Sequence, residues 1–324
     1  MNEDKMKALV LAGGYATRLW PITKNRAKPL LPLNGKPILS YILDEVEEIS
    51  DIDNIILATN ERFEESFEEY ISGREGNYEL VIEKQDSEEE KYGAIGGMIN
   101  VIENREKDDY LIIGGDNYYS FKIQDFLDCC DKKGSIVNAC FKLSDPEEAQ
   151  NYGIVQFDED QKIIQFQEKP ENPSTLMAST ACYYFTQERL SAFDDYVEYW
   201  KGRIPEEKYL DEPGRFLEWI VEEFEAYAYP FEGKWVDIGT RAGYLRAESE
   251  IGEEETLLGR IKESDMEGTV TVLEGSVVEN SKIENSIIFE DCTIKDSIVK
   301  NSLIGEGTEL IGTDIREGLI EDIK

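Results

Sequence analysis

Short apolar runs alternate with segments of helical periodicity through the first half of the chain. The apolar runs cover residues 7–11, 54–59, 79–83 and 110–113, and helical patterns occur near 38–48, 61–71 and 96–104. Strands and helices in turn predict βαβ units and a mainly parallel sheet with helices on both faces. A sheet covered on both faces accounts for a strand as apolar as Tyr110-Leu111-Ile112-Ile113. We therefore predict a doubly wound α/β fold for this half.

The pattern changes after residue 137. Strand-like runs follow one another up to residue 185, and a helical stretch near 216–224 precedes a short strand and loop around 235–239. This order predicts a mixed α/β structure for the second part of the domain. Residues 251–267 contain Glu253-Glu254-Glu255 and lack clear periodicity, so we expect a domain over 1–250 followed by a linker over 251–267.

A short repeat marks the last part of the chain, 268–324. Small residues recur every five or six positions, and a β-branched residue follows each of them two positions later. The small residues are Ser276, Ser281, Ser286, Cys292, Ser297 and Ser302; the β-branched residues are Val278, Ile283, Ile288, Ile294, Val299 and Ile304. This period predicts a short left-handed β-helix of the hexapeptide type, with small residues at the corners and β-branched residues in the lumen. An ordinary meander of edge strands is the alternative.

Charge and composition limit the classes of function. The 324 residues include 34 Lys or Arg and 70 Asp or Glu, a net charge of −36, which disfavours binding to nucleic acid or to an anionic membrane. No cationic and apolar leader follows Met1, and no apolar run approaches ~18 residues, so we expect a cytoplasmic protein. The acidic excess is typical of a halophilic cytosol. Five cysteines without a C-x-x-C pair predict reduced core thiols.

Two absences direct attention to phosphate chemistry. The chain has no histidine, which excludes Ser-His, Cys-His and His-metal mechanisms. No acidic residue lies between Asp4 and Asp44. If the charges were placed at random, a gap of this length at this position would have a probability of only roughly 10⁻⁴. The basic residues in this segment are Lys5, Lys7, Arg18, Lys24, Arg26, Lys28 and Lys36. An anion-binding site is therefore expected here.

A glycine turn follows the first predicted strand within this basic segment. Gly13-Gly14 allows close approach of a phosphate or a base, and its successive N–H groups can form an anion-binding nest. The stretch matches neither G-x-x-x-x-G-K-[ST] nor G-x-G-x-x-G, which disfavours a kinase-like or NAD-binding site. The positions that follow are Thr17-Arg18-Leu19, Pro21, Thr23 and Lys28-Pro29-Leu30-Leu31-Pro32.

These positions together resemble the signature of the sugar-1-phosphate nucleotidylyltransferases, the family of glucose-1-phosphate thymidylyl- and uridylyltransferases. The resemblance continues, in the family's order, through Gly115-Asp116-Asn117, Tyr152-Gly153, Glu168-Lys169-Pro170, Trp235, Asp237-Ile238-Gly239-Thr240 and Tyr244-Leu245. It implies that residues 1–250 form a Rossmann-like nucleotidyltransferase domain. The implied reaction joins a nucleoside triphosphate, dTTP or UTP, to a sugar 1-phosphate similar to glucose 1-phosphate and releases pyrophosphate. Such an in-line displacement requires positioning and charge neutralisation more than proton transfer.

The resemblance also implies roles for individual residues. Catalytic roles fall to Arg18 on the β- and γ-phosphates, to Lys28 on the α-phosphate and to Lys169 on the sugar phosphate. Asp116 and Asp237 would bind Mg²⁺, which prefers oxygen ligands. The nucleotide would contact Leu11, Ala12, Gly13, Gly14, Gln85 and Gly93, and the sugar phosphate would contact Gly153, Glu168, Lys169 and Tyr183. Lys24, Arg26 and Lys36 are interpreted as contributors to the field or as surface residues.

Two stretches depart from the family pattern. Gly93-Ala94-Ile95-Gly96-Gly97 replaces a G-L-A or G-T-A run, which leaves the base open. Residues 212–219 replace an acidic-Ile-Thr-Asp run, which leaves the sugar open, and their helix could serve packing alone through Phe216 and Trp219.

Two other functions compete with this interpretation. An acyltransferase of the β-helix type would require a histidine base, which the chain lacks. A catalytically inactive subunit that senses nucleotides or sugar phosphates remains the alternative, although Arg18, Lys28, Asp116, Lys169 and Asp237 are all present. A homo-oligomer, assembled through the β-helix, is expected.

Overall fold

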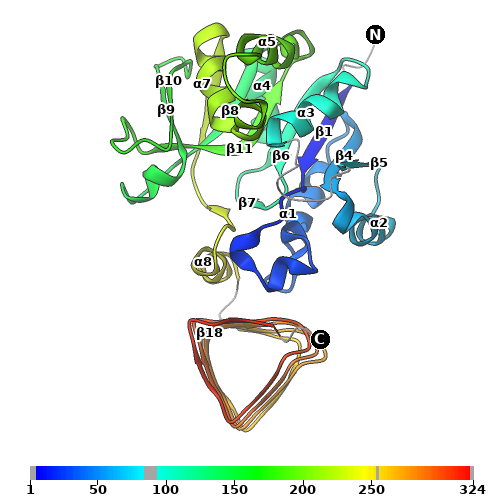
Figure 1. Ribbon diagram of the computed structural model, residues 1–324, viewed down its shortest axis with the longest axis vertical. Helices are drawn as coiled ribbons and strands as arrows, with labels where there is room; N and C mark the ends of the chain where they lie inside the picture. The colour runs from blue at the N-terminus through cyan, green and yellow to red at the C-terminus, as the bar shows by residue number, and fades with distance from the viewer. Residues whose placement is uncertain (1–4, 84–92, 253–254, 322–324) are drawn as a thin grey trace. The chain divides into compact units, whose positions relative to one another are not determined.

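The computed structural model describes residues 5–83, 93–252 and 255–321 (Figure 1). The chain divides into two compact units that do not follow the sequence order. The first unit comprises residues 1–13, 43–115 and 119–235, and the second comprises 14–42, 116–118 and 236–324. The basic segment after Gly13 belongs to the same unit as the C-terminal strands.

A nine-stranded sheet forms the centre of the first unit. Four neighbouring strands that pair in parallel stand in the order β6, β1, β4 and β5. Strand β11 joins β6 in the antiparallel direction, and β8 and β12 form a further parallel pair. The strands are β1 (Met6–Leu11), β4 (Ile52–Asn60), β5 (Tyr78–Glu83), β6 (Asp109–Gly114), β8 (Ile136–Lys142), β9 (Gly153–Phe157), β10 (Ile163–Glu168), β11 (Met177–Phe185) and β12 (Ala226–Phe231). The parallel half confirms the sheet predicted from alternating strands and helices.

Helices cover this sheet in Figure 1. They are α2 (Glu64–Ser72), α3 (Gly93–Glu103), α4 (Ile123–Lys133), α5 (Ser191–Trp200), α6 (Glu206–Asp211) and α7 (Pro213–Glu223), while α1 (Ile38–Val46) contributes to both units. The apolar strands pack between the helices, so that Leu9, Ile56 and Ile112 are fully buried in one core. The parallel strands end together at one edge of the sheet, where ligands bind in folds of this kind.

The second unit begins with three single turns, η1 (Thr17–Leu19), η2 (Ile22–Lys24) and η3 (Lys28–Leu30). A short hairpin, β2 (Pro32–Leu33) with β3 (Lys36–Pro37), follows them. Later segments of the unit are the helix α8 (Arg241–Ile251), which Thr240 caps by accepting a hydrogen bond from the Gly243 amide at 3.1 Å, and a C-terminal coil of strands.

The C-terminal coil consists of stacked parallel strands, seen end-on as a triangle in Figure 1. Its strands are β14 (Glu255–Leu257), β15 (Arg260–Lys262), β16 (Asp265–Val272), β17 (Val277–Glu279), β18 (Lys282–Ile288), β19 (Thr293–Lys295), β20 (Ile298–Lys300), β21 (Leu303–Ile304), β22 (Glu309–Ile311), β23 (Asp314–Arg316) and β24 (Leu319–Ile320). Residues 255–262, within the segment expected as a linker, already form β14 and β15, which pair in parallel with the next coil.

The repeat along this coil has the predicted chemistry. All six β-branched residues of the repeat are fully buried, together with Cys292. The small residues form a ladder, since the Ser276, Ser281 and Ser286 hydroxyls accept hydrogen bonds from backbone amides of the next coil at 2.9–3.1 Å. Asn280, Asn285, Asp296 and Asn301 take left-handed backbone conformations at the corners, with φ of 43–50°. The ladder and the buried lumen favour a coil over a meander of edge strands.

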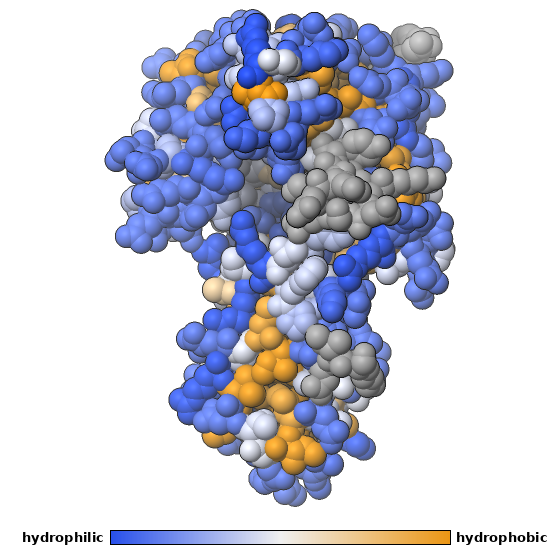
Figure 2. Space-filling view, viewed as in Figure 1, coloured by the Kyte–Doolittle hydropathy of each residue, from blue (hydrophilic) through white to orange (hydrophobic). Residues whose placement is uncertain are grey.

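Polar residues dominate the outside of the molecule, and most of the face seen in Figure 2 is hydrophilic. None of the helices in the described part of the chain is both long and apolar enough to span a membrane. Four of the five cysteine thiols are buried and Cys129 is half-buried; none forms a disulfide.

Candidate active site

Three of the predicted charged residues meet in the second unit. Lys28 begins η3, Asp116 follows strand β6 after Gly115, and Asp237 ends the short strand β13 (Trp235–Asp237). The Lys28 ammonium lies 2.6 Å from Asp116 Oδ2 and 3.3 Å from Asp237 Oδ1. Both carboxylates therefore face the same small volume, as expected of residues that act on one charged group.

Burial and charge both influence this cluster. Burial raises the pKa of Asp237, and the neighbouring Asp116 acts in the same sense, whereas Lys28 and Arg18 act in the opposite sense. Burial lowers the pKa of the Lys28 ammonium, but the two carboxylates outweigh it and the pKa is raised. Lys28 is only 9% exposed and remains a cation in this setting.

Asp116 is held in place by its neighbour. Asn117, the first residue of β7 (Asn117–Tyr119), donates a hydrogen bond from Nδ2 to Asp116 Oδ1 at 2.9 Å, and β7 pairs with β13. Each of the two strands thus carries one of the two carboxylates at or beside its end. Their oxygens suit a divalent cation that keeps water or phosphate oxygens as further ligands. No group of three or more His, Cys, Asp or Glu side chains that could hold a metal occurs in the described ranges.

The glycine turn and its continuation form an irregular loop. Ala16 adopts a left-handed conformation before η1, and the buried Thr23 donates a hydrogen bond from Oγ1 to the Ala16 carbonyl at 2.8 Å. Arg18 is exposed on η1, and its charge acts on Asp237. A methyl group added at Gly14 would meet nothing within 4 Å, so that residue borders open space. Arg18 and Gly14 are thus accessible to a ligand.

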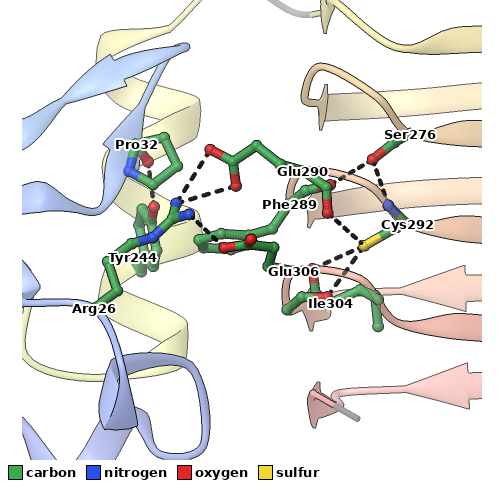
Figure 3. Close-up of polar contacts among 10 residues, drawn as sticks. Arg26, Pro32, Tyr244, Ser276, Phe289, Glu290, Cys292, Ile304 and Glu306 are labelled. Carbon is green, nitrogen blue, oxygen red and sulfur yellow. Dashed lines mark hydrogen bonds and ion pairs between the residues drawn. The ribbon is translucent and has the colours of Figure 1, made fainter. Parts of the chain in front are cut away.

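Arg26 has a different place from the one expected. Its guanidinium donates two hydrogen bonds to Glu290 at 3.1 Å and one to Glu306 at 2.8 Å, both in the C-terminal coil, and lies over the Phe289 ring (Figure 3). In the same region the Tyr244 hydroxyl donates to the Pro32 carbonyl. Arg26 therefore ties the basic loop to the coil within the second unit.

The other described residues that were predicted for the nucleotide, Leu11, Ala12, Gly13 and Gly93, lie in the first unit. The Ala12 amide donates to the Ala58 carbonyl at 2.7 Å, and Asn60 Nδ2 donates to the Gly13 carbonyl at 2.7 Å, which fixes the backbone beyond the half-buried Leu11. Gln85 lies outside the described residues. Gly93 has a φ of +76°, and a Cβ there would lie 2.5 Å from the Leu210 carbonyl oxygen, so its α carbon faces the backbone of α6.

Three of the four residues predicted for the sugar phosphate, Gly153, Glu168 and Lys169, lie where β9 and β10 pair. Gly153 is directly opposite Glu168, and a Cβ on Gly153 would lie 3.3 Å from Glu168 Oε2. Lys169 follows with a φ of 44°; its ammonium is exposed and lies 3.2 Å from Glu168 Oε1. Tyr183 is buried in β11 and hydrogen-bonded to Ser179, and burial raises the pKa of its hydroxyl.

Several neighbours of these residues were not predicted. Glu218 on α7 accepts a hydrogen bond from the Glu168 amide at 2.9 Å, and a Cβ on Gly214 would lie 1.9 Å from Glu168 Oε2. Phe216 and Trp219 are buried in the core, so α7 both packs and positions Glu168. The departure from the family pattern at 212–219 was the only signal in the sequence.

Comparisons with known proteins identify the family of the chain. A family model described as nucleotidyl transferase matches residues 7–254. The bifunctional protein GlmU of Methanocaldococcus jannaschii is 27% identical over 277 residues, which cover 84% of this chain and 61% of the relative. Glucose-1-phosphate adenylyltransferase of Bacillus cereus is 29% identical over 271 residues, which cover 79% of this chain and 70% of the relative.

A solved structure shares the fold. UDP-glucose pyrophosphorylase, complexed with UDP-glucose, superimposes with a TM-score of 0.63 at 21% identity, over 75% of this chain and 97% of that one. The chain spans 52–61% of the length of the GlmU relatives of Methanocaldococcus jannaschii and Methanococcus vannielii.

Proposed function

The chain belongs to the nucleotidyl transferase family, and from that membership we propose that it transfers a nucleoside monophosphate from dTTP or UTP to a sugar 1-phosphate similar to glucose 1-phosphate. The products are pyrophosphate and a nucleoside diphosphate sugar. The convergence of Lys28, Asp116 and Asp237 is the observation that carries the proposal, because it offers one buried cation and two carboxylates to a phosphate reaction.

The proposed step is an in-line displacement. An oxygen of the sugar phosphate forms a bond to the α-phosphorus, the bond from that phosphorus to the β-bridging oxygen breaks, and pyrophosphate leaves with the electron pair. Lys28 would stabilise charge on the α-phosphate, and the fork of Arg18 would bind the β- and γ-phosphates. Because both reacting groups are already ionised, the step needs no general base, which agrees with a chain that lacks histidine.

Asp116 and Asp237 would hold Mg²⁺. Two carboxylates that already contact one ammonium fit a small cation, which would complete its coordination with water and phosphate oxygens. When bound, the ion supplies charge neutralisation of the triphosphate. Asn117 would keep Asp116 oriented, since it donates to the Oδ1 atom and leaves Oδ2 to face the cation.

Lys169 and Glu168 would bind the acceptor. The exposed Lys169 ammonium suits the phosphate, and Glu168 with the Gly153 backbone suits sugar hydroxyls. Tyr183 would contribute a wall of this pocket through its buried ring.

The C-terminal coil has a separate role in this proposal. We propose that it is a left-handed β-helix and that it assembles a homo-oligomer. The assembly is supported by four exposed apolar residues on the coil, Leu257, Leu258, Ile298 and Ile311. We expect this protein to act in the cytoplasm. The acidic surface would suit a halophilic cytosol.

Pyrophosphate release tests the proposal. Purified protein with Mg²⁺ is supplied with each nucleoside triphosphate in turn and with a panel of sugar 1-phosphates. We expect release with UTP or dTTP. Tight nucleotide binding without release from any pair would instead support a sensing subunit of the same fold.

Gly214→Ala should weaken the acceptor site selectively. The new methyl group would overlap the Glu168 carboxyl, which must then turn away from its position. We expect the KM for the sugar 1-phosphate to rise about 10-fold while the KM for the nucleotide stays within about 2-fold, as loss of one or two polar contacts implies. Gly73→Ala is the control, because a methyl group there meets nothing within 4 Å. Equal effects of the two substitutions would contradict the placement of Glu168 in the acceptor site.

A further inference from the structure

Glu83 ends the parallel strand β5 at the same sheet edge as Gly13 and Asn60. Strand β5 pairs with β4, whose last residue is Asn60, and β4 pairs with β1, which Gly13 follows two residues later. Glu83 Oε2 lies 3.7 Å from the place of a Cβ on Gly13, and Oε1 lies 2.4 Å from the place of a Cβ on Gly97 of α3. The Glu83 carboxyl therefore lies close to the backbone of two glycines, Gly13 and Gly97.

Gly97 makes room for this carboxyl. Any other residue at position 97 would put a β carbon 2.4 Å from Glu83 Oε1, well inside van der Waals contact. Gly97 lies in the stretch that departs from the family pattern, so the departure and the carboxyl occur at the same point in space. The position of the Glu83 carboxyl therefore depends on the absence of a side chain at Gly97.

Within the described ranges, Glu83 also lacks the hydrogen-bond partners that another buried carboxyl, Glu248, has. In the second unit, Glu248 is 2% exposed and accepts hydrogen bonds from the Thr271 hydroxyl and from the Asn34 amide at 2.9 Å. Glu83 forms no hydrogen bond or ion pair with any residue that the structure describes. Burial raises its pKa to about 7, and no other group of the described residues contributes to the shift. No group among the described residues therefore occupies its donor and acceptor capacity.

We propose that Glu83 contacts the nucleobase of the bound triphosphate: its protonated carboxyl donates a hydrogen bond to O4 of a uracil or thymine ring and accepts one from N3–H. This inference rests on the proposed function and assigns the base contact to a residue in the described part of the chain. A neutral carboxyl offers one donor and one acceptor side by side, which is the pattern that an imide edge requires. An ionised carboxylate would accept from N3–H but would repel O4.

Nucleotide binding as a function of pH tests this assignment. A carboxyl with a pKa of about 7 changes its neutral fraction about 10-fold between pH 6 and pH 8, so the Kd for UTP should rise about 10-fold over this range. The facing groups in the described residues, Gly13, Gly97 and Asn60, do not titrate. Calorimetry on the full chain measures the Kd without turnover, so the result stands even where no sugar 1-phosphate is accepted.

Three variants complete the experiment. Glu83→Gln presents the same donor and acceptor without a titrating proton, and should lose the pH dependence that is due to this residue. Glu83→Ala should bind UTP at least about 10-fold more weakly at pH 6, as the loss of a paired base contact implies. Glu68→Gln, at an exposed position of α2, should keep the pH profile of the natural chain, including the titration of the nucleotide phosphates. The assignment is wrong if Glu83→Gln retains that profile, or if Glu83→Ala binds UTP as tightly as the natural chain.

Discussion

Asp237→Asn and Asp116→Asn are each expected to lower turnover at least ~100-fold, because they remove charge from the place where a divalent cation would bind. Asparagine keeps the size and shape of aspartate, so packing changes little. Burial and Asp116 raise the pKa of the Asp237 carboxyl by more than Lys28 and Arg18 lower it. On balance, therefore, the ionised form of Asp237 does not stabilise the fold. The substitution should therefore impair binding of the metal far more than it affects folding.

Two measurements separate these effects. Pyrophosphate release at saturating substrates gives the turnover, and Mn²⁺ binding followed by electron paramagnetic resonance reports the loss of a metal ligand. Asp128→Asn, on an exposed position of α4, is the matched control and should behave as the natural chain in both measurements. Turnover within about 3-fold of the natural chain in either variant would reject the metal assignment, because removal of a metal ligand costs far more than that.

Local patterns were enough to predict the parallel strands and the C-terminal coil. Each strand of the β1, β4, β5 and β6 group is a short apolar run, and each lies within two residues of the predicted bounds. In the coil, the position of one small residue determines that of the next β-branched residue, so the repeat itself carries the information. Such features depend on neighbours in the sequence and need no knowledge of distant contacts.

Contacts between distant residues were not predictable in this way. The basic segment that contains Arg18 and Lys28 belongs to the same unit as the coil more than 200 residues later, partly through Arg26 and its ion pairs with Glu290 and Glu306. Neither partner carries a signal of this pairing, since glutamates are abundant throughout the chain. The early start of the coil was hidden for a similar reason, because its first strands are short and polar.

The candidate site divides along the same line. The resemblance supplied Lys28, Asp116 and Asp237, and the structure brings the three together. The position of the Glu83 carboxyl depends instead on a gap left by Gly97, fourteen residues further on, and the position of Glu168 depends on Gly214. In both cases the carboxyl occupies space that only a glycine leaves free. A single sequence does not distinguish a glycine that is required by such a contact from any other glycine.

Lys28→Met should destabilise the fold and abolish most of the turnover. The substitution keeps the length and volume of the side chain but leaves the partly buried carboxylates of Asp116 and Asp237 facing each other without a cation. Removal of one partner from a buried ion pair is costly, and we expect the free energy of unfolding to fall by at least about 2 kcal/mol. Turnover should fall at least ~100-fold, because the cation proposed to stabilise the α-phosphate is lost.

Magnesium provides the decisive comparison for this variant. A divalent cation that binds to the two carboxylates would relieve their repulsion, so Mg²⁺ should raise the unfolding temperature of Lys28→Met more than that of the natural chain, in which the ammonium already compensates the charge. Lys5→Met, an exposed lysine paired with Asp53 in the first unit, should show no such difference. Loss of stability that Mg²⁺ leaves unchanged would mean that Lys28 contributes through packing, and that the two carboxylates do not share a cation.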